Sequence, residues 1–334
     1  MRNVIKPHQS TYHIQSTDSK RNTIRSTHFW NVLGVSIGFC LLLIASYIIS
    51  PASRTVQDLL NLLKQSSGLG LLSIGQTMVI ITGGIDLCLG SIVTLVHVLT
   101  IGLMQGDPSR IVPVCLLGLA VGLTAGLFNG LGITKARIAP FVMTLCTDFI
   151  LRGLYMIYTK GQPKGILADQ FRNLGRLRVF DLIPLSVLFW LALSALFIFV
   201  LKKTVFGYHV HMIGANPACS ALSGVKNDRT IILVYTLAGT LAAFTSLILT
   251  MDMSAASLNL GADYSMDSIS ATVVGGTLFT GGIGGVEGTI AGALIIRLIT
   301  SLLQKANIAN WGKLLIQSIL ILSVVAANSR RKKT

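Results

Sequence analysis

Long apolar stretches separated by short polar segments constrain this chain more than any other feature. The first stretch, 29–49, is about 21 residues long, enough for a helix to cross about 30 Å of hydrocarbon. Further stretches follow at 66–84, 88–105, 112–133, 139–158, 183–201, 230–251, 266–280, 285–303 and 311–327. The pattern predicts an all-α polytopic membrane protein with about ten transmembrane helices.

The composition agrees with lipid as the main solvent of this chain. Of its 334 residues, 52% are hydrophobic and 12% are charged, whereas soluble domains average about 25% charged residues. The formal net charge of +15 raises the possibility of nucleic-acid binding. The positive residues lie mostly beside apolar stretches, as in polytopic membrane proteins, so we expect a lipid environment and no nucleic-acid partner.

The distribution of lysine and arginine predicts the orientation. The spans divide the chain into a polar tail, 1–28, one transmembrane domain, 29–327, and a basic tail, 328–334. Fifteen of the 27 Lys and Arg residues then lie on the side of both termini, including the loop 202–229, and nine lie on the other side. Because positive loops stay in the cytoplasm, both termini are expected there.

Two glycine-rich segments, 82–91 and 274–288, interrupt the apolar pattern. Non-helical backbone at membrane depth is tolerated only inside protein or beside a watery cavity, and the acid Asp86 within it is a functional candidate. A Gly-Gly-x-x-Leu run in the first segment and a Gly-Gly-x-Leu run in the second form a short internal echo, as in repeat-built transporters. The alternatives stay open: a plain hairpin turn with Asp86 capping a helix, and glycines that serve only close helix packing. The candidate pathway residues are Gln76, Thr77, Thr82, Gly83, Gly84, Asp86, Thr144, Gly275 and Gly276.

Other polar residues within the spans favour structural roles. Asp148 and Arg152 are spaced to pair on one helix face. His97 is expected to be a satisfied interior histidine, and Asp267 and Glu287 complement the N-termini of their helices.

The sequence indicates no bound cofactor. The five cysteines form no CxxC pair and are expected to act as small hydrophobic residues, so no metal site is predicted. The phosphate-binding pattern GxxxxGK followed by Ser or Thr is absent from the chain, so we expect a transport subunit and not an ATP-hydrolysing enzyme.

A short polar segment between two apolar stretches carries both signals of a deliberately ended helix. Asn216 suits the N-cap, Pro217 the first helical position, and Gly224 the residue past the C-terminus. Residues 217–223 therefore predict a surface helix of about two turns.

Five segments together resemble the sugar permeases of the ribose, xylose, arabinose and galactoside type, which are membrane subunits of bacterial ATP-binding-cassette importers. The segments are Gly75–Ser91 (GQTMVIITGGIDLCLGS), Gly126–Leu145, Leu151–Pro163, Phe206–Val225 and Ile269–Ile295.

This resemblance implies a vitamin-B12-permease-like fold in the bacterial plasma (inner) membrane, a second permease chain, an ATPase subunit that uses ATP, and an extracytoplasmic sugar-binding protein. It also implies that one segment is the coupling helix that docks on the ATPase. Its residues are Gly214, Ala215, Asn216, Pro217, Ala218, Ser220, Ala221, Leu222, Ser223 and Gly224.

The sequence constrains the transported substrate and the energy source less than it constrains the class of transporter. Cys88, Asp148 and Glu287 depart from the residues usual in this family, so a substrate other than ribose is open. A permease for an amino acid or another small solute remains an alternative. So does an ion-coupled secondary transporter that uses Asp86 or the Asp148–Arg152 pair.

Overall fold

A computed structural model describes residues 55–179, 182–253, 255–308, 311–319 and 322. The expected span 29–49, both tails and part of the expected span 311–327 lie outside the described residues.

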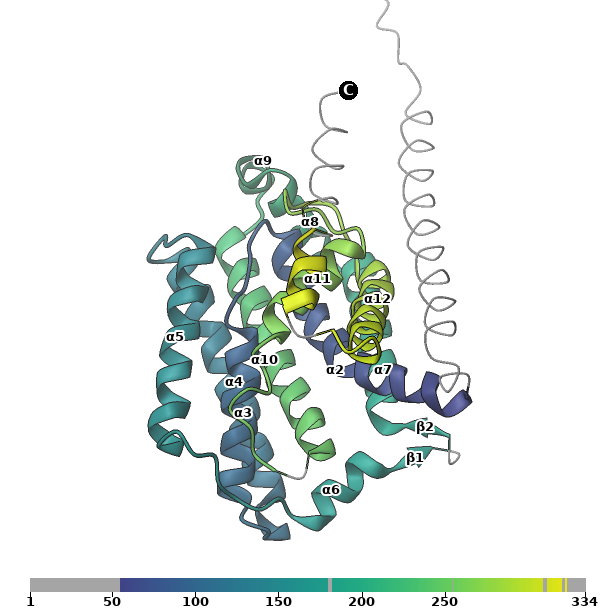
Figure 1. Cartoon of the computed structure of the whole chain (residues 1–334). Coiled ribbons are helices and arrows are strands. Elements are labelled where there is room, and N and C mark those ends of the chain that lie inside the picture. The colour runs from purple at the N-terminus through teal and green to yellow at the C-terminus, as the bar shows by residue number, and fades with distance from the viewer. Residues whose placement is uncertain (1–54, 180–181, 254, 309–310, 320–321, 323–334) are drawn as a thin grey trace, which may run out of the picture.

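The described part is mainly helical (Figure 1). The helices are α2 (Val56–Ile81), α3 (Leu89–Met104), α4 (Ile111–Thr134), α5 (Pro140–Thr159), α6 (Asp169–Arg176), α7 (Leu185–Lys203), α8 (Val205–Ala215), α9 (Pro217–Leu222), α10 (Asn227–Asp252), α11 (Tyr264–Val274) and α12 (Val286–Lys305). A 3₁₀ turn, η2 (Pro108–Arg110), precedes α4, and two short antiparallel strands, β1 (Arg178–Val179) and β2 (Ile183–Pro184), precede α7. Residues 311–319 are also helical.

Within the described residues, five helical segments are long and apolar enough to cross a membrane: Pro108–Thr134, Pro140–Thr159, Leu185–Lys203, Asn227–Asp252 and Val286–Lys305. The apolar helix Leu89–Met104 is shorter. These segments agree with the predicted all-α polytopic class.

Two expected spans differ from the observed helices by more than a few residues. The expected helix 66–84 begins at Val56 and ends at Ile81. The expected span 266–280 is wrong as one continuous helix, because α11 has only 11 residues, about 16 Å at 1.5 Å per residue. Residues 275–285 after it are not helical.

Helix α10 packs at the centre of the bundle, against α2, α3 and α4. Its crossing with α4 is close because glycines face it: a Cβ atom at Gly122 would overlap the carbonyl oxygen of Gly239. The opposite side of α4 exposes large apolar side chains such as Leu116 and Phe128. One face of small residues and one of large apolar residues suits a helix that packs on one side and meets lipid on the other.

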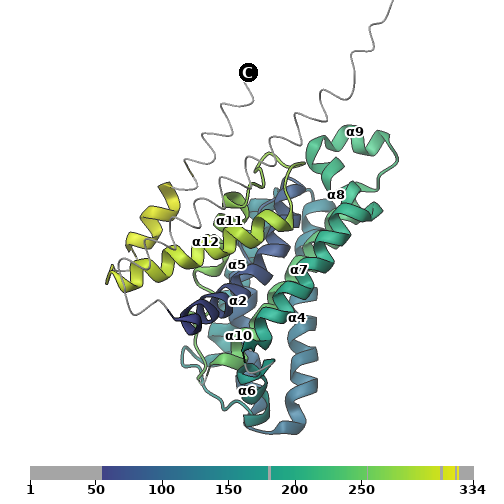
Figure 2. The same cartoon turned by 90° about the vertical axis from the view of Figure 1, so that its right-hand side faces the viewer.

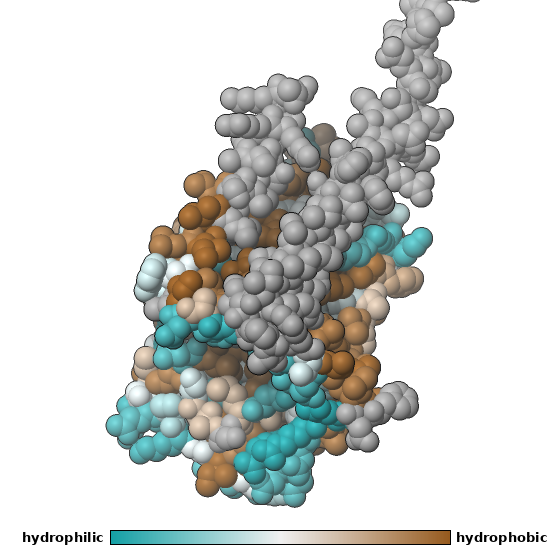
Figure 3. Space-filling view, turned by 45° about the vertical axis from the view of Figure 1, so that its right-hand side comes forward, coloured by the Kyte–Doolittle hydropathy of each residue, from teal (hydrophilic) through white to brown (hydrophobic). Residues whose placement is uncertain are grey.

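The two ends of the molecule carry different short elements. Helices α8 and α9 lie at one end, and α6 with the β1–β2 hairpin lies at the opposite end, as Figures 1 and 2 both show. Figure 3 shows hydrophobic residues over much of the side of the molecule and hydrophilic residues gathered toward the α6 end.

Candidate functional site

The predicted short helix is present as α9, and its N-terminus is capped as expected. The side-chain oxygen of Asn216 accepts hydrogen bonds from the N–H groups of Ala218 at 3.0 Å and Cys219 at 3.1 Å, and Pro217 occupies the first turn. Both amides would otherwise lack a partner at the helix start.

The C-terminus of α9 is closed by a Schellman motif. Gly224 has a φ of +83°, its N–H donates to the oxygen of Ala221 at 3.0 Å, and the N–H of Val225 donates to Ser220 at 3.1 Å. The helix ends at Leu222, one residue before the expected end, and the Leu222 side chain is 90% exposed. α9 is therefore a rigid, capped element that presents an apolar side chain to its surroundings.

The helix α8 was not expected within the loop 202–229. It begins directly after α7, where the hydroxyl of Thr204 accepts from the N–H of Gly207 at 3.4 Å, and it ends one residue before the Asn216 cap. A threonine followed by apolar residues is a helix-start signal that sequence reasoning could have used.

The first interrupted segment is a true break between two helices. α2 ends at Ile81, residues 82–88 are not helical, and α3 begins at Leu89. Gly83 has a φ of +84°, its N–H donates to Ile80 at 2.9 Å, and the N–H of Gly84 donates to Val79 at 3.0 Å. This Schellman motif ends α2, and Thr82 adds a hydroxyl bond to Val79.

The segment after this break lies inside the bundle, unlike a plain hairpin turn at the surface. Asp86 is completely buried, and its Oδ1 accepts from the N–H of Cys88 at 2.9 Å just ahead of α3, while its Oδ2 has no partner among the described residues. Thr144 of α5 binds the same segment: its hydroxyl donates to Ile85 and accepts from the N–H of Leu87, both at 3.2 Å. α5 therefore fixes the path of the broken backbone.

The second interrupted segment repeats the same ending. Gly276 has a φ of +90°, its N–H donates to Val273 at 2.9 Å, and the N–H of Thr277 donates to Thr272 at 3.2 Å. Gly276 is thus the structural equivalent of Gly83. Gly83 is the first glycine of its Gly-Gly pair and Gly276 is the second, so the two similar runs in the sequence are offset by one residue.

The structure also joins the first interruption to the start of α11. The hydroxyl of Ser265 donates to the oxygen of Leu87 and accepts from the N–H of Gly90, both at 2.8 Å. A Cβ atom at Gly90 would overlap the oxygen of Gly261, so the backbone in the first turn of α3 contacts the backbone just ahead of α11. Sequence reasoning missed Ser265 and Gly261, because nothing local in the sequence indicates which segment they meet.

The other candidate pathway residues lie at contacts between helices, and Gln76 and Thr77 are fully buried. Thr77 bonds Thr289 of α12 at 2.7 Å, and a Cβ atom at Gly275 would lie 2.5 Å or so from the Gly288 backbone. Gln76 is completely buried, and neither polar atom of its side chain has a partner among the described residues. Of the nine candidates, Gly83 is exposed, whereas Thr82, Gly275 and Gly276 are partly exposed.

The polar residues expected to be structural have partners in the bundle, although Asp148 Oδ1 has none among the described residues. Arg152 Nε lies 2.8 Å from Asp148 Oδ2. His97 has Nδ1 2.8 Å from the Thr250 hydroxyl, and Nε2 accepts from the N–H of Ser257 at 3.1 Å. The amide of Asn129 donates to the sulfur of Cys88 at 3.0 Å.

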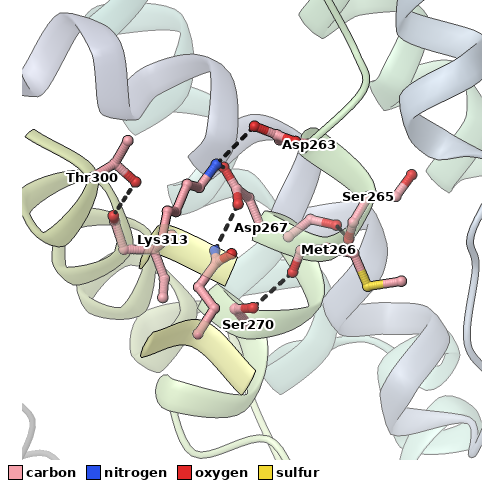
Figure 4. A network of polar contacts seen from close by, with 10 residues as sticks. Asp263, Ser265, Met266, Asp267, Ser270, Thr300 and Lys313 are labelled. Atoms are coloured by element: carbon pink, nitrogen blue, oxygen red, sulfur yellow. Dashed lines mark hydrogen bonds and ion pairs between the residues drawn. The ribbon is translucent and has the colours of Figure 1, made fainter. Parts of the chain in front are cut away.

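A buried charge network occupies the start of α11 (Figure 4). Asp267 lies in the first turn, as expected, but it also binds Lys313 at 3.1 Å and accepts from Gln317 at 2.6 Å. Lys313 reaches Asp263 as well, at 3.1 Å. The network ties the segment 311–319 to the short helix α11.

Among the described residues, no group of three or more His, Cys, Asp or Glu side chains is arranged to hold a metal ion. The chemistry that the arrangement offers is instead a set of hydroxyl groups, amides and broken-helix backbone.

Comparison with known proteins covers nearly the whole chain. A family model described as the permease component of the branched-chain amino acid transport system matches residues 58–325. The ribose import permease protein RbsC of Bacillus subtilis (strain 168) is 34% identical over 94% of this chain and 99% of its own length. RbsC of Escherichia coli (strain K12) is 31% identical over 92% and 96%, respectively. The galactose/methyl galactoside import permease protein MglC of Haemophilus influenzae is 31% identical over 88% and 93%. No solved structure matches the chain.

Proposed function

The chain belongs to the family of permease components of the branched-chain amino acid transport system, and on that premise we propose that it is the permease subunit of an ATP-binding-cassette importer for a monosaccharide. The observation that carries this proposal is the similarity, over nearly their full lengths, to permeases named for the import of ribose and of galactose. The substrate is a ribose-like pentose or a hexose.

The partners follow from the same class of transporter. The chain pairs with a second permease chain in the bacterial plasma membrane, receives sugar from an extracytoplasmic binding protein, and docks on an ATPase subunit that consumes the ATP. The rigid caps of α9 and its exposed Leu222 support α9 as the coupling helix. In this orientation, the α9 end and both termini face the cytoplasm.

The pathway is built around the two broken helices. A neutral sugar needs hydroxyl and backbone groups more than fixed charges, and the exposed Gly83 with the partly exposed Thr82 and Gly276 provides them. Asp86 and Thr144 act behind that surface, where they hold the segment 82–88 in place. We also propose about ten spans in the manner of the vitamin-B12 permease, with the two broken helices beside the translocation pathway.

Uptake in the native host tests the proposal. Deleting this gene should abolish uptake of one labelled monosaccharide from a panel of ribose, xylose, arabinose and galactose, and a plasmid copy should restore it. Depleting ATP with arsenate should stop uptake, whereas ionophores that collapse ion gradients should not when fermentation maintains ATP. Uptake that survives ATP depletion but fails without an ion gradient would instead support a secondary transporter. Uptake of an amino acid alone would overturn the sugar assignment.

A further inference from the structure

Three backbone segments from distant parts of the sequence meet directly behind α9. They are the last residue of α2, the end of α8 and the loop 275–285. A Cβ atom at Gly214, near the end of α8, would overlap both the oxygen of Ile81 and the nitrogen of Gly282. A Cβ atom at Gly281 would lie 2.9 Å from the oxygen of Gly214 and 3.1 Å from the nitrogen of Gly83. The three segments therefore touch through backbone alone, with no flexible side chain between them.

Hydrogen bonds hold this contact in register. The N–H of Gly282 donates to the oxygen of Ile81 at 2.8 Å, which satisfies a carbonyl left without a helical partner at the end of α2. The ring atom Nδ1 of His211, on α8, lies 3.1 Å from the oxygen of Gly282. We call the set Ile81, His211, Gly214 and Gly282 the glycine junction.

An ion pair ties the same elements together a second time. Lys202, in the last turn of α7, pairs with Glu287, in the first turn of α12. The pair therefore joins the chain just before α8 to the chain just after the loop 275–285. A partly exposed pair contributes little stability, roughly 0–1 kcal/mol, so its main consequence is the relative position of these two helices.

The glycine junction connects α9 with both interrupted segments. On one side, α8 leads through Ala215 into the Asn216 cap of α9 without a loop. On the other side, Ile81 is the last helical residue before the interrupted segment 82–88, and the loop 275–285 is the break after α11. Any displacement of α9 that α8 follows as a rigid helix reaches both interrupted segments at once.

We propose that the glycine junction, supported by the Lys202–Glu287 pair, transmits movement of α9 to both broken helices, with Gly214 and Gly282 as positioning residues for transport. This inference rests on the proposed function, because it takes α9 as the surface that the ATPase moves. Close-packed contacts pass displacement on in discrete steps because there is no free volume to absorb it.

The test measures sugar molecules imported per ATP hydrolysed, using the complete importer in proteoliposomes with its binding protein. This ratio does not depend on the fraction of protein that folds, because inactive complexes lower both rates together. Gly214→Ala should reduce the ratio about fivefold or more, which is the lower range of coupling between distant sites. Gly153→Ala is the matched control, since Gly153 is also helical and a Cβ atom there meets nothing within 4 Å; it should leave the ratio unchanged.

Variants of the Lys202–Glu287 ion pair provide a second test if the Gly214→Ala variant does not fold. Lys202→Glu and Glu287→Lys should each lower the ratio, and the double variant should restore it. A loss of stability alone would not lower the ratio, because the ratio does not depend on the fraction of protein that folds. A folded Gly214→Ala variant with the wild-type ratio overturns the inference. So does a charge swap that fails to restore the ratio. If the wild-type importer moves no sugar at all, the proposed function fails instead.

Discussion

At the scale of single residues, positive φ angles decide where the helices of this chain break. Gly83 and Gly276 each occupy the position just past a helix, at φ of +84° and +90°, and nothing lies within 4 Å of the Cβ atom that either one lacks. Space therefore does not require glycine at these positions, but backbone conformation does.

Replacing Gly83 with alanine isolates that conformational effect. Because an L-residue in the left-handed region costs roughly 1–2 kcal/mol, Gly83→Ala should lower the midpoint of thermal unfolding in detergent. Gly153→Ala should leave the midpoint unchanged or raise it, because alanine favours the helix by about 1 kcal/mol. Equal midpoints for the two variants would contradict the role of φ at Gly83.

The buried charge of Asp267 makes Lys313 another residue whose loss is costly. Among the described residues, Lys313→Met leaves a carboxylate that is 1% exposed with only the amide of Gln317, and breaking such a pair costs about 3–5 kcal/mol. The thermal midpoint should fall strongly, and adding Asp267→Asn should recover part of the loss. Lys164→Met, at an exposed lysine, should change little. No recovery in the double variant would mean that Lys313 acts through other contacts.

At the scale of elements, α9 has too few residues to be stable without its caps. Isolated helices shorter than about 12–15 residues are marginal in water, and α9 has 6 residues. The Asn216 cap, the first-turn proline and the Schellman motif together define it.

Removing the cap should loosen α9 alone. Asn216→Ala loses two hydrogen bonds and about 1 kcal/mol, so hydrogen exchange at the amides of Ala218 and Cys219 should accelerate. Asn216→Asp, which keeps an accepting oxygen, should retain protection. Equal exchange in both variants would show that the cap does not hold the helix.

Replacing α9 tests its role in transport. A Gly/Ser segment of equal length in place of 217–223 should abolish ATPase stimulation by sugar-loaded binding protein, because the docking element is gone. Membrane insertion should persist, since the exchanged residues lie outside the apolar spans. Normal stimulation in this variant would contradict the coupling function of α9.

At the scale of the whole molecule, the orientation depends on parts of the chain outside the described residues. Within the described segments, the side assigned to the cytoplasm carries six Lys or Arg residues and the opposite side carries eight. The first set is Lys135, Arg137, Lys202, Lys203, Lys226 and Arg229; the second is Lys64, Arg110, Lys160, Lys164, Arg172, Arg176, Arg178 and Lys305. The predicted excess on the cytoplasmic side therefore comes from the two terminal tails.

Cys219 on α9 reports the orientation directly, because its side chain is exposed. A membrane-impermeant maleimide should label the protein in inverted vesicles but not in intact spheroplasts. The label attributable to Cys219 is the difference between the wild type and Cys219→Ser. Labelling of Cys219 from the outside of intact spheroplasts would reverse the topology.

The amino-acid sequence by itself determined the class of protein and the local ends of its elements. Apolar stretches define membrane helices because lipid leaves backbone groups no other partners. Asn216, Pro217 and Gly224 define α9 because caps act within a few residues. The spacing of Asp148 and Arg152 likewise predicted a pair that the structure contains.

Only the tertiary structure decided which of these elements touch. The continuous helix expected at 266–280 was wrong because Gly276 at positive φ ends α11, and the helix α8 was missed. The contacts of Gly214 with Ile81 and Gly282, and of Lys313 with Asp267, join residues far apart in the sequence. Capping and hydrophobicity act locally and can be read along the chain, whereas close contacts between distant backbones exist only after the helices have packed.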